Sequence, residues 1–173
     1  MLTDVHTHST FSADGETPLS GMLARAQELG IAYYGIAEHF DYDYLADGIL
    51  PEGKTVPMID ASAYFSEVRR LQESYAGRMH VLAGGEFGYT SNPAAHRMYQ
   101  ETIARFSPDF VVNSVHSVNG KDAWFSEYFA GKTREEAYRT YLEKVRESLD
   151  APYPYDIVAH IGYVSRNAPY SDN

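Results

Sequence analysis

Residues 2–8 read Leu2-Thr3-Asp4-Val5-His6-Thr7-His8, a short strand-type run that leads into two histidines. In a strand, side chains at positions i and i+2 point to the same face, so His6 and His8 can bind one metal ion side by side. Asp4 lies two residues earlier, and we expect it to support the site by accepting a hydrogen bond that orients a ligand histidine. This stretch therefore predicts both the first strand and the first candidate ligands.

Strand-type and helical segments alternate along the rest of the chain. The expected strands are 2–5, 31–37, 80–83, 110–115 and 155–161, and the expected helices are 18–29, 61–75, 93–106 and 133–149. Such alternation predicts an α/β fold with a parallel sheet and helices outside it, either doubly wound or barrel-like. The segment 41–59 is too long for a simple connection, and we expect it to be a functional loop.

Two helices carry clear terminal signals. Thr17 is the expected N-cap of the first helix, with Pro18 in its first turn and Gly30 as its stop. Thr133 and Glu136 match a capping box at the start of the helix predicted over 133–149.

Composition narrows the class of protein. The 173 residues are expected to form one domain over 1–173, with 44% hydrophobic and 22% charged residues, as in globular proteins. The net charge of −10 and the lack of a basic cluster argue against nucleic acid and against anionic membranes. With no cysteine, thiol nucleophiles and disulfides are excluded, and a cytoplasmic location is expected. The N-terminus has no signal-peptide pattern. The sequence also has no run of ~18 apolar residues, so we expect no membrane span.

Side chains that can bind a metal stand at the carboxyl end of every predicted strand. They are His6 and His8, His39, Glu86, His116 and His160. Ligands of parallel α/β proteins bind at this edge, so we expect these residues to form one site. Mixed imidazole and carboxylate ligands suit zinc, manganese or iron. His80 and His96 fall elsewhere, and we interpret them as structural or surface residues.

Two further carboxylates lie near this set in the sequence. Asp14 lies in an Asp-Gly turn after the first strand, and its position near His6 and His8 makes it a candidate ligand. Glu38 precedes His39 and is expected to point to the other face, as a supporting residue. The chain has no Gly-x-Ser-x-Gly motif, no phosphate-binding loop and no dinucleotide fingerprint, so serine hydrolases and Rossmann oxidoreductases have no support.

Several of these motifs together resemble the PHP family, the polymerase and histidinol phosphatase domains. The resemblance rests on Asp4-Val5-His6-Thr7-His8-Ser9, Asp14-Gly15, Glu38-His39, Gly85-Glu86, Ser114-Val115-His116 and Ala159-His160, in the family's order. Residues 113–149 are most similar to the histidinol-phosphatase branch, with Ser117, Gly120, Trp124 and Tyr138.

The resemblance implies a distorted (β/α)7 TIM-like barrel with two or three divalent metals. Carried over residue by residue, the ligands would be His6 and His8 for a first ion, Glu86 as a bridge, His116 and His160 for a second ion, and Asp14 and His39 for a third. The resemblance also implies a catalytic role for five of these seven residues. They are His6, His8, Glu86, His116 and His160. Arg166 and Ser117 are the implied substrate-binding residues, Arg166 for the phosphate.

The chain departs from the family pattern after His160, where the expected Asp-x-His motif is absent. A barrel of this type typically takes ~250 residues, so the chain resembles the N-terminal two thirds of a member, truncated at the C-terminus with about five strands. An open barrel leaves unpaired strand edges, which predicts self-association.

The resulting hypothesis is a metal-dependent phosphomonoesterase that hydrolyses L-histidinol phosphate, in histidine biosynthesis, by attack of metal-bound hydroxide. The alternatives are another PHP phosphoesterase acting on nucleotides or small phosphate esters, and an inactive PHP domain with a binding or assembly role. An amidohydrolase-type barrel also begins with His-x-His but often bridges its metals with a lysine, where this chain has Glu86.

Overall fold

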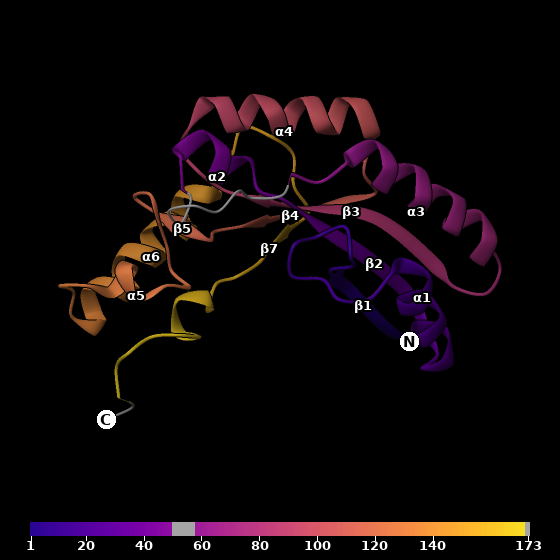
Figure 1. Cartoon of the computed structure of the whole chain (residues 1–173), viewed down its shortest axis with the longest axis horizontal. Coiled ribbons are helices and arrows are strands. Elements are labelled where there is room, and N and C mark those ends of the chain that lie inside the picture. Colours follow the sequence, from indigo (N-terminus) through magenta and orange to yellow (C-terminus); the bar gives the residue numbers. More distant parts are fainter. Residues whose placement is uncertain (50–57, 172–173) are drawn as a thin grey trace.

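The computed structural model describes residues 1–49 and 58–171. Five parallel strands form one sheet in the order β1-β2-β3-β4-β7, which is also their order in the chain (Figure 1). They are β1 (Leu2–Thr7), β2 (Ile31–Phe40), β3 (His80–Gly88), β4 (Phe110–Ser114) and β7 (Ile157–Val158). In a doubly wound sheet the strand order reverses direction at one point. This sheet has no such reversal, so it is barrel-like. The sheet is open, because its edge strands β1 and β7 are not paired with each other. This confirms the prediction of an incomplete α/β barrel.

Helices and a small hairpin connect the strands. They are α1 (Leu19–Glu28), α2 (Tyr42–Asp47), α3 (Ala61–Tyr75), α4 (Pro93–Phe106), the hairpin of β5 (Ser117–Val118) and β6 (Lys121–Asp122), α5 (Ser126–Phe129), α6 (Arg134–Ser148) and the 3-10 turn η1 (Tyr163–Ser165). The sequence did not predict the hairpin. In the part of the chain that the structure describes, no helix is long and apolar enough to cross a membrane.

The ends of the elements confirm some predictions and correct others. The capping box at Thr133 and Glu136 is present, and Gly30 follows α1 with a φ of +71°. The Thr17 cap was wrong, because Pro18 keeps an extended backbone (ψ 148°) and takes the N-cap position itself. The last strand is two residues long, shorter than the predicted 155–161. The expected loop over 41–59 contains α2, and its residues 50–57 lie outside the described part.

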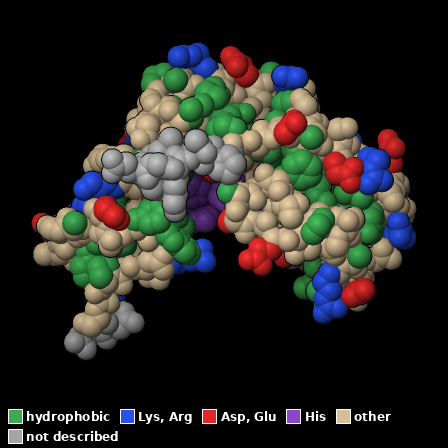
Figure 2. Space-filling model, viewed as in Figure 1, with side chains coloured by type: hydrophobic (Ala, Val, Ile, Leu, Met, Phe, Trp, Pro, Cys, Tyr) green, Lys and Arg blue, Asp and Glu red, His purple; other side chains and the backbone are tan. Residues whose placement is uncertain are grey.

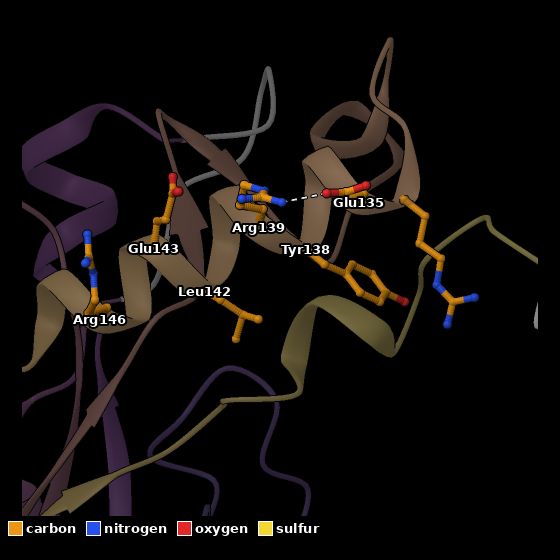
Figure 3. Close-up of a pocket in the computed structure, with 7 residues that line it drawn as sticks. Glu135, Tyr138, Arg139, Leu142, Glu143 and Arg146 are labelled. Carbon is orange, nitrogen blue, oxygen red and sulfur yellow. Dashed lines mark hydrogen bonds and ion pairs between the residues drawn. The ribbon is translucent and has the colours of Figure 1, made fainter.

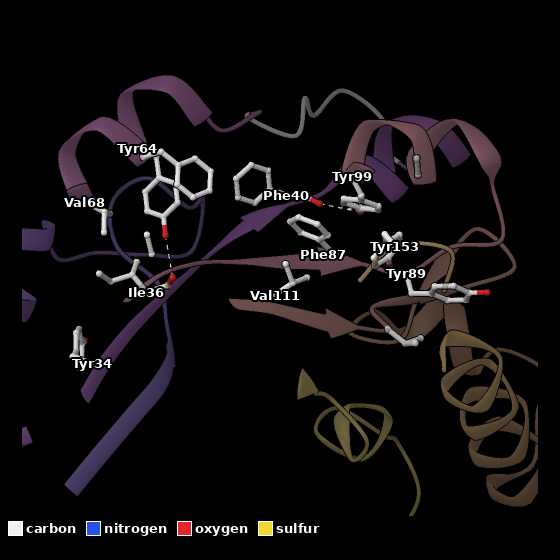
Figure 4. Close-up of a cluster of buried hydrophobic side chains, with 14 of the residues drawn as sticks. Tyr34, Ile36, Phe40, Tyr64, Val68, Phe87, Tyr89, Tyr99, Val111 and Tyr153 are labelled. Carbon is white, nitrogen blue, oxygen red and sulfur yellow. Dashed lines mark hydrogen bonds between the residues drawn. The ribbon is translucent and has the colours of Figure 1, made fainter. Parts of the chain in front are cut away.

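The hydrophobic core lies mainly between the sheet and its helices. Figure 4 shows Phe40 and Phe87 from the strands packed beside Tyr64 of α3 and Tyr99 of α4. The rings of Phe87 and Tyr99 are stacked, with centroids 4.5 Å apart. Aromatic groups thus provide much of the contact between the sheet and these helices.

A smaller apolar cluster lies on the other face of the sheet. It consists of Ala37, Phe110 and Val112, with Val5 and Leu82 packed against it. Phe110 lies over Gly84, where an added Cβ would be 2.3 Å from the ring. Since Glu86 is two residues beyond Gly84, it shares this inner face and lies nearer the carboxyl end of the strand.

Helix α6 has one buried and one charged face. Ala137, Tyr141 and Val145 point into the core. Figure 3 shows the outward face, where Arg139 pairs with Glu135 at 2.5 Å. None of the residues that line the pocket on this outward face belongs to the predicted site.

Candidate metal centre

Glu86 is at the centre of the predicted site. Its side chain is fully buried on the inner face of β3. Oε1 lies 2.7 Å from Nε2 of His160 and 3.3 Å from Nε2 of His116. Oε2 lies 3.1 Å from Nε2 of His6 and 3.4 Å from Nε2 of His8. Histidines at the ends of β1, β4 and β7 thus meet at a carboxylate on β3. Figure 2 shows histidines at the bottom of a hollow.

His39 brings two more carboxylates to this edge. Its Nε2 is 3.5 Å from Oδ2 of Asp14, and its Nδ1 is 3.4 Å from Oδ1 of Asp41. The imidazole is stacked on that of His8, with ring centroids 4.3 Å apart. Nδ1 of His39 also lies 3.4 Å from Oε2 of Glu86. His39 therefore joins the Glu86 cluster to the loop that carries Asp14.

Among residues 1–49 and 58–171, the potential ligand atoms form three groups, each with atoms within 4.8 Å of one another. The groups are His6, Glu86 and His160; His8, Asp14 and His39; and His39, Asp41 and His116. All seven predicted ligands are included. His6 and His8 fall in different groups, although the resemblance assigns them to one ion. Their rings remain close, with centroids 5.2 Å apart.

Sequence reasoning missed Asp41. The predicted second strand ends at residue 37, which places Asp41 in the long loop, although it lies two positions beyond His39. The strand extends to Phe40, further than predicted, and so carries Asp41 to the edge of the sheet. Its Oδ1 also lies 4.0 Å from Nδ1 of His116. The i, i+2 spacing from His39 was the signal that could have found it.

The cluster favours ionised carboxylates. Burial alone would raise the pKa of Glu86, but hydrogen bonds from the surrounding imidazoles, that of His116 first, hold it well below its usual value. A hydrogen bond with His39 lowers the pKa of Asp14 to about 2. Burial lowers the pKa of His8 to about 4, which leaves its ring neutral. Burial would lower the pKa of His39 and His116, but hydrogen bonds to carboxylates raise it to about 11 and about 9, so both of these rings are protonated. A metal ion that bound them would displace their protons.

Unpartnered buried atoms test whether a metal fits. Oε2 of Glu86, Nδ1 of His8 and Nδ1 of His39 are buried and make no well-aligned hydrogen bond with the described residues, although charged groups lie within 3.4 Å of the first and the last. Buried polar atoms are normally satisfied, so these atoms indicate ligands for a cation. Imidazole nitrogens with carboxylate oxygens suit zinc, manganese or iron. The residues present therefore fit divalent metal ions.

Glu38 and Asp4, the two predicted supporting residues, have different environments. Glu38 is fully buried and accepts hydrogen bonds from the backbone N–H of Ser9 (3.0 Å) and from the hydroxyls of Ser9 and Ser12 (2.5 Å each). It therefore fixes the loop between β1 and α1, which carries Asp14. Asp4 accepts a hydrogen bond at 3.5 Å from the backbone N–H of His6, not from a ring as predicted.

The two predicted substrate-binding residues belong to the segments after β4 and β7. Ser117 is buried in β5, where it pairs with Asp122. Arg166 follows η1, and its guanidinium lies over the ring of Trp124, 5.1 Å from the centroid. Their contact with a substrate stays a prediction.

The interpretation of the two remaining histidines is consistent with the structure. His80 stacks on Tyr33 at the start of β3, with centroids 4.4 Å apart. Nε2 of His96 lies 2.6 Å from the carbonyl oxygen of Thr90.

An open parallel α/β barrel with histidines and carboxylates at the carboxyl ends of its strands defines a class of barrel proteins with a strand-end metal centre. Comparison with known proteins identifies the family within this class. The model of the PHP domain matches residues 4–172, and the chain belongs to this family.

The curated relatives share a name. A histidinol-phosphatase of Lactococcus lactis subsp. lactis is 29% identical over 178 residues, covering 98% of this chain and 60% of the relative. A probable histidinol-phosphatase of Clostridium acetobutylicum is 24% identical, covering 99% of this chain and 62% of the relative. The chain thus spans about three fifths of the length of these relatives.

Two solved structures are similar to nearly the whole chain. One is histidinol phosphate phosphatase from Lactococcus lactis subsp. lactis, in complex with zinc, L-histidinol and phosphate. It has a TM-score of 0.86 and 27% identity, covering 99% of this chain and 62% of that one. A putative histidinol phosphatase from Listeria monocytogenes has a TM-score of 0.72 and 23% identity, covering 94% of this chain and 63% of that one, and supports the fold alone.

Proposed function

We propose that this chain carries the metal centre of a phosphomonoesterase that hydrolyses L-histidinol phosphate to histidinol and phosphate. The observation that carries the proposal is the buried Glu86 carboxylate, whose oxygens lie 2.7–3.4 Å from five imidazoles at the strand ends. The similar Lactococcus structure, which contains zinc, L-histidinol and phosphate, supports this substrate.

Seven side chains would hold two or three divalent ions of zinc, manganese or iron. They are His6, His8, Asp14, His39, Glu86, His116 and His160. When bound, such ions lower the pKa of a coordinated water, neutralise phosphate oxygens and stabilise a leaving alkoxide. The chain has a net charge of −10, so this local positive charge would be needed to attract a phosphate dianion.

The protein's own residues would position these groups. Glu86 would bridge neighbouring ions, since Oε1 faces His160 and His116 while Oε2 faces His6 and His8. Glu38 would hold the loop of Asp14 in place through its serine contacts. We assign Arg166 and Ser117 to substrate binding, Arg166 as the cation for the phosphate.

The test combines zinc content with turnover of L-histidinol phosphate by the whole protein. We expect Glu86→Gln to lose bound zinc and to abolish phosphate release, because the amide cannot supply a bridging negative charge. His80→Gln is the matched control, since His80 lies on the same strand outside the cluster. Turnover near the wild-type rate in Glu86→Gln would contradict the proposal. Faster release of phosphate from nucleotides would favour the nucleotide-directed alternative.

A further inference from the structure

His160 has an unusual backbone conformation. Its φ is +60°, in the left-handed region that residues with a Cβ adopt with strain. The strand before His160 has few backbone contacts with the sheet. Strand β7 pairs with β4 at Ile157 and Val158, and one further hydrogen bond runs from the Ala159 N–H to the Asn113 carbonyl. The sheet itself therefore does not hold His160, and other contacts must keep it in place.

Tyr141 supplies such a contact. It lies on α6 with its side chain fully buried. Its hydroxyl oxygen is 2.6 Å from the carbonyl oxygen of His160 and 2.7 Å from that of Val115. The His160 carbonyl also accepts from the N–H of Tyr163 at 3.0 Å, but that bond lies within a local turn. The Tyr141 hydroxyl is the contact that ties His160 to a helix and to the end of β4.

The two carbonyls belong to the segments that present neighbouring ligands. Val115 directly precedes His116, and the rings of His116 and His160 meet edge to face with centroids 5.0 Å apart. Both rings contact Oε1 of Glu86, at 3.3 Å and 2.7 Å. A shift of either backbone would therefore separate one ring from this oxygen.

We propose that Tyr141 is a positioning residue of the metal centre, whose hydroxyl fixes the spacing of His116 and His160 through the carbonyls of Val115 and His160. The inference rests on the proposed function, because it assumes that both histidines bind metal. The hydroxyl shares its one proton between the two carbonyl oxygens and so keeps them close to each other. An apolar side chain has no donor and could not do this. Residues that orient ligands commonly change metal affinity by about 10–100-fold when they are replaced.

The test compares Tyr141→Phe with Tyr64→Phe, a closely matched control. Tyr64 is also fully buried, and its hydroxyl also donates to two carbonyls, those of Ile36 (3.0 Å) and Gly84 (2.7 Å). Each variant keeps the ring and loses only the hydroxyl. Zinc affinity is measured by competition with a chelating dye, and the absorption spectrum of the cobalt-substituted protein reports coordination geometry.

We expect Tyr141→Phe to weaken zinc binding by about 10–100-fold and to change the cobalt spectrum, while Tyr64→Phe leaves both unchanged. Equal zinc affinity in Tyr141→Phe and wild type would overturn the inference and leave the proposed function standing. An equal loss of zinc affinity in both variants would also overturn the inference, because it would show that losing any buried tyrosine hydroxyl loosens the fold. Absence of zinc binding in the wild-type protein would overturn the proposed function and this inference together.

Discussion

Replacing Asp122 by alanine tests whether one buried carboxylate joins three segments beside the metal centre. Asp122 is 8% exposed and lies on β6. It accepts hydrogen bonds from the hydroxyls of Tyr44 (2.6 Å) and Tyr163 (3.1 Å) and from the backbone N–H of Trp124 (2.7 Å). Burial and the charge of Asp122 raise the pKa of both tyrosines, so both stay protonated and donate.

The expected cost follows from the number of donors that lose their acceptor. An unsatisfied donor costs about 1–3 kcal/mol, and the lower end applies because these groups are only partly buried. Asp122→Ala leaves three such donors and is expected to reduce the free energy of unfolding by about 3 kcal/mol. In a protein of this size that lowers Tm by about 6–12 °C. Asp122→Asn keeps one acceptor oxygen and is expected to cost about 1 kcal/mol.

Urea denaturation followed by far-UV circular dichroism measures these differences. Tyr44→Phe removes one donor together with its bond, so it should cost less than Asp122→Ala. The double variant should be no less stable than Asp122→Ala, because the Tyr44 hydroxyl has already lost its acceptor. The reasoning is refuted if Asp122→Ala unfolds within about 0.5 kcal/mol of wild type, the usual range for a surface substitution.

Two further predictions concern packing and the metals. Gly84→Ala places a Cβ 2.3 Å from the Phe110 ring, and such overpacking is expected to cost about 1–3 kcal/mol in urea denaturation. Adding Phe110→Leu to that variant should recover part of the loss, and no recovery would contradict the steric explanation. Zinc at 100 times its Kd should stabilise the fold by about 2.7 kcal/mol, so EDTA should lower the calorimetric Tm of the zinc-loaded protein. Identical transitions with and without EDTA would exclude zinc binding to the folded state.

Local sequence patterns were enough to predict most elements and the site's position. The capping box at Thr133 and the stop at Gly30 depend on neighbouring residues, and both are present. The cap at Thr17 was wrong because a single extended residue, Pro18, displaced it from the capping position. Element ends respond to such one-residue shifts, whereas the alternation of strands and helices persists over many residues.

The contacts within the site could not be predicted in the same way. Placing histidines after parallel strands predicts that they share an edge, but not which ring approaches which oxygen. That choice depends on how the strands pack, which groups His6 with Glu86 and His160, whereas His8, also 3.4 Å from Glu86, falls in a group with Asp14 and His39. Asp41 was missed because its role requires β2 to extend to Phe40.

The sequence by itself predicted the α/β alternation, the parallel sheet and the six candidate ligands at strand ends, because periodicity and strand ends are local properties. The seventh candidate, Asp14, lies in a loop, and its role as a ligand was implied by the family resemblance. The family resemblance already implied the barrel, and the tertiary structure alone decided the grouping of the ligands and the contacts of Tyr141 and Asp122. Tyr141 reaches the carbonyls of Val115 and His160 across 26 and 19 residues of chain. Contacts of that kind arise from packing a helix against a sheet, and no local pattern specifies them.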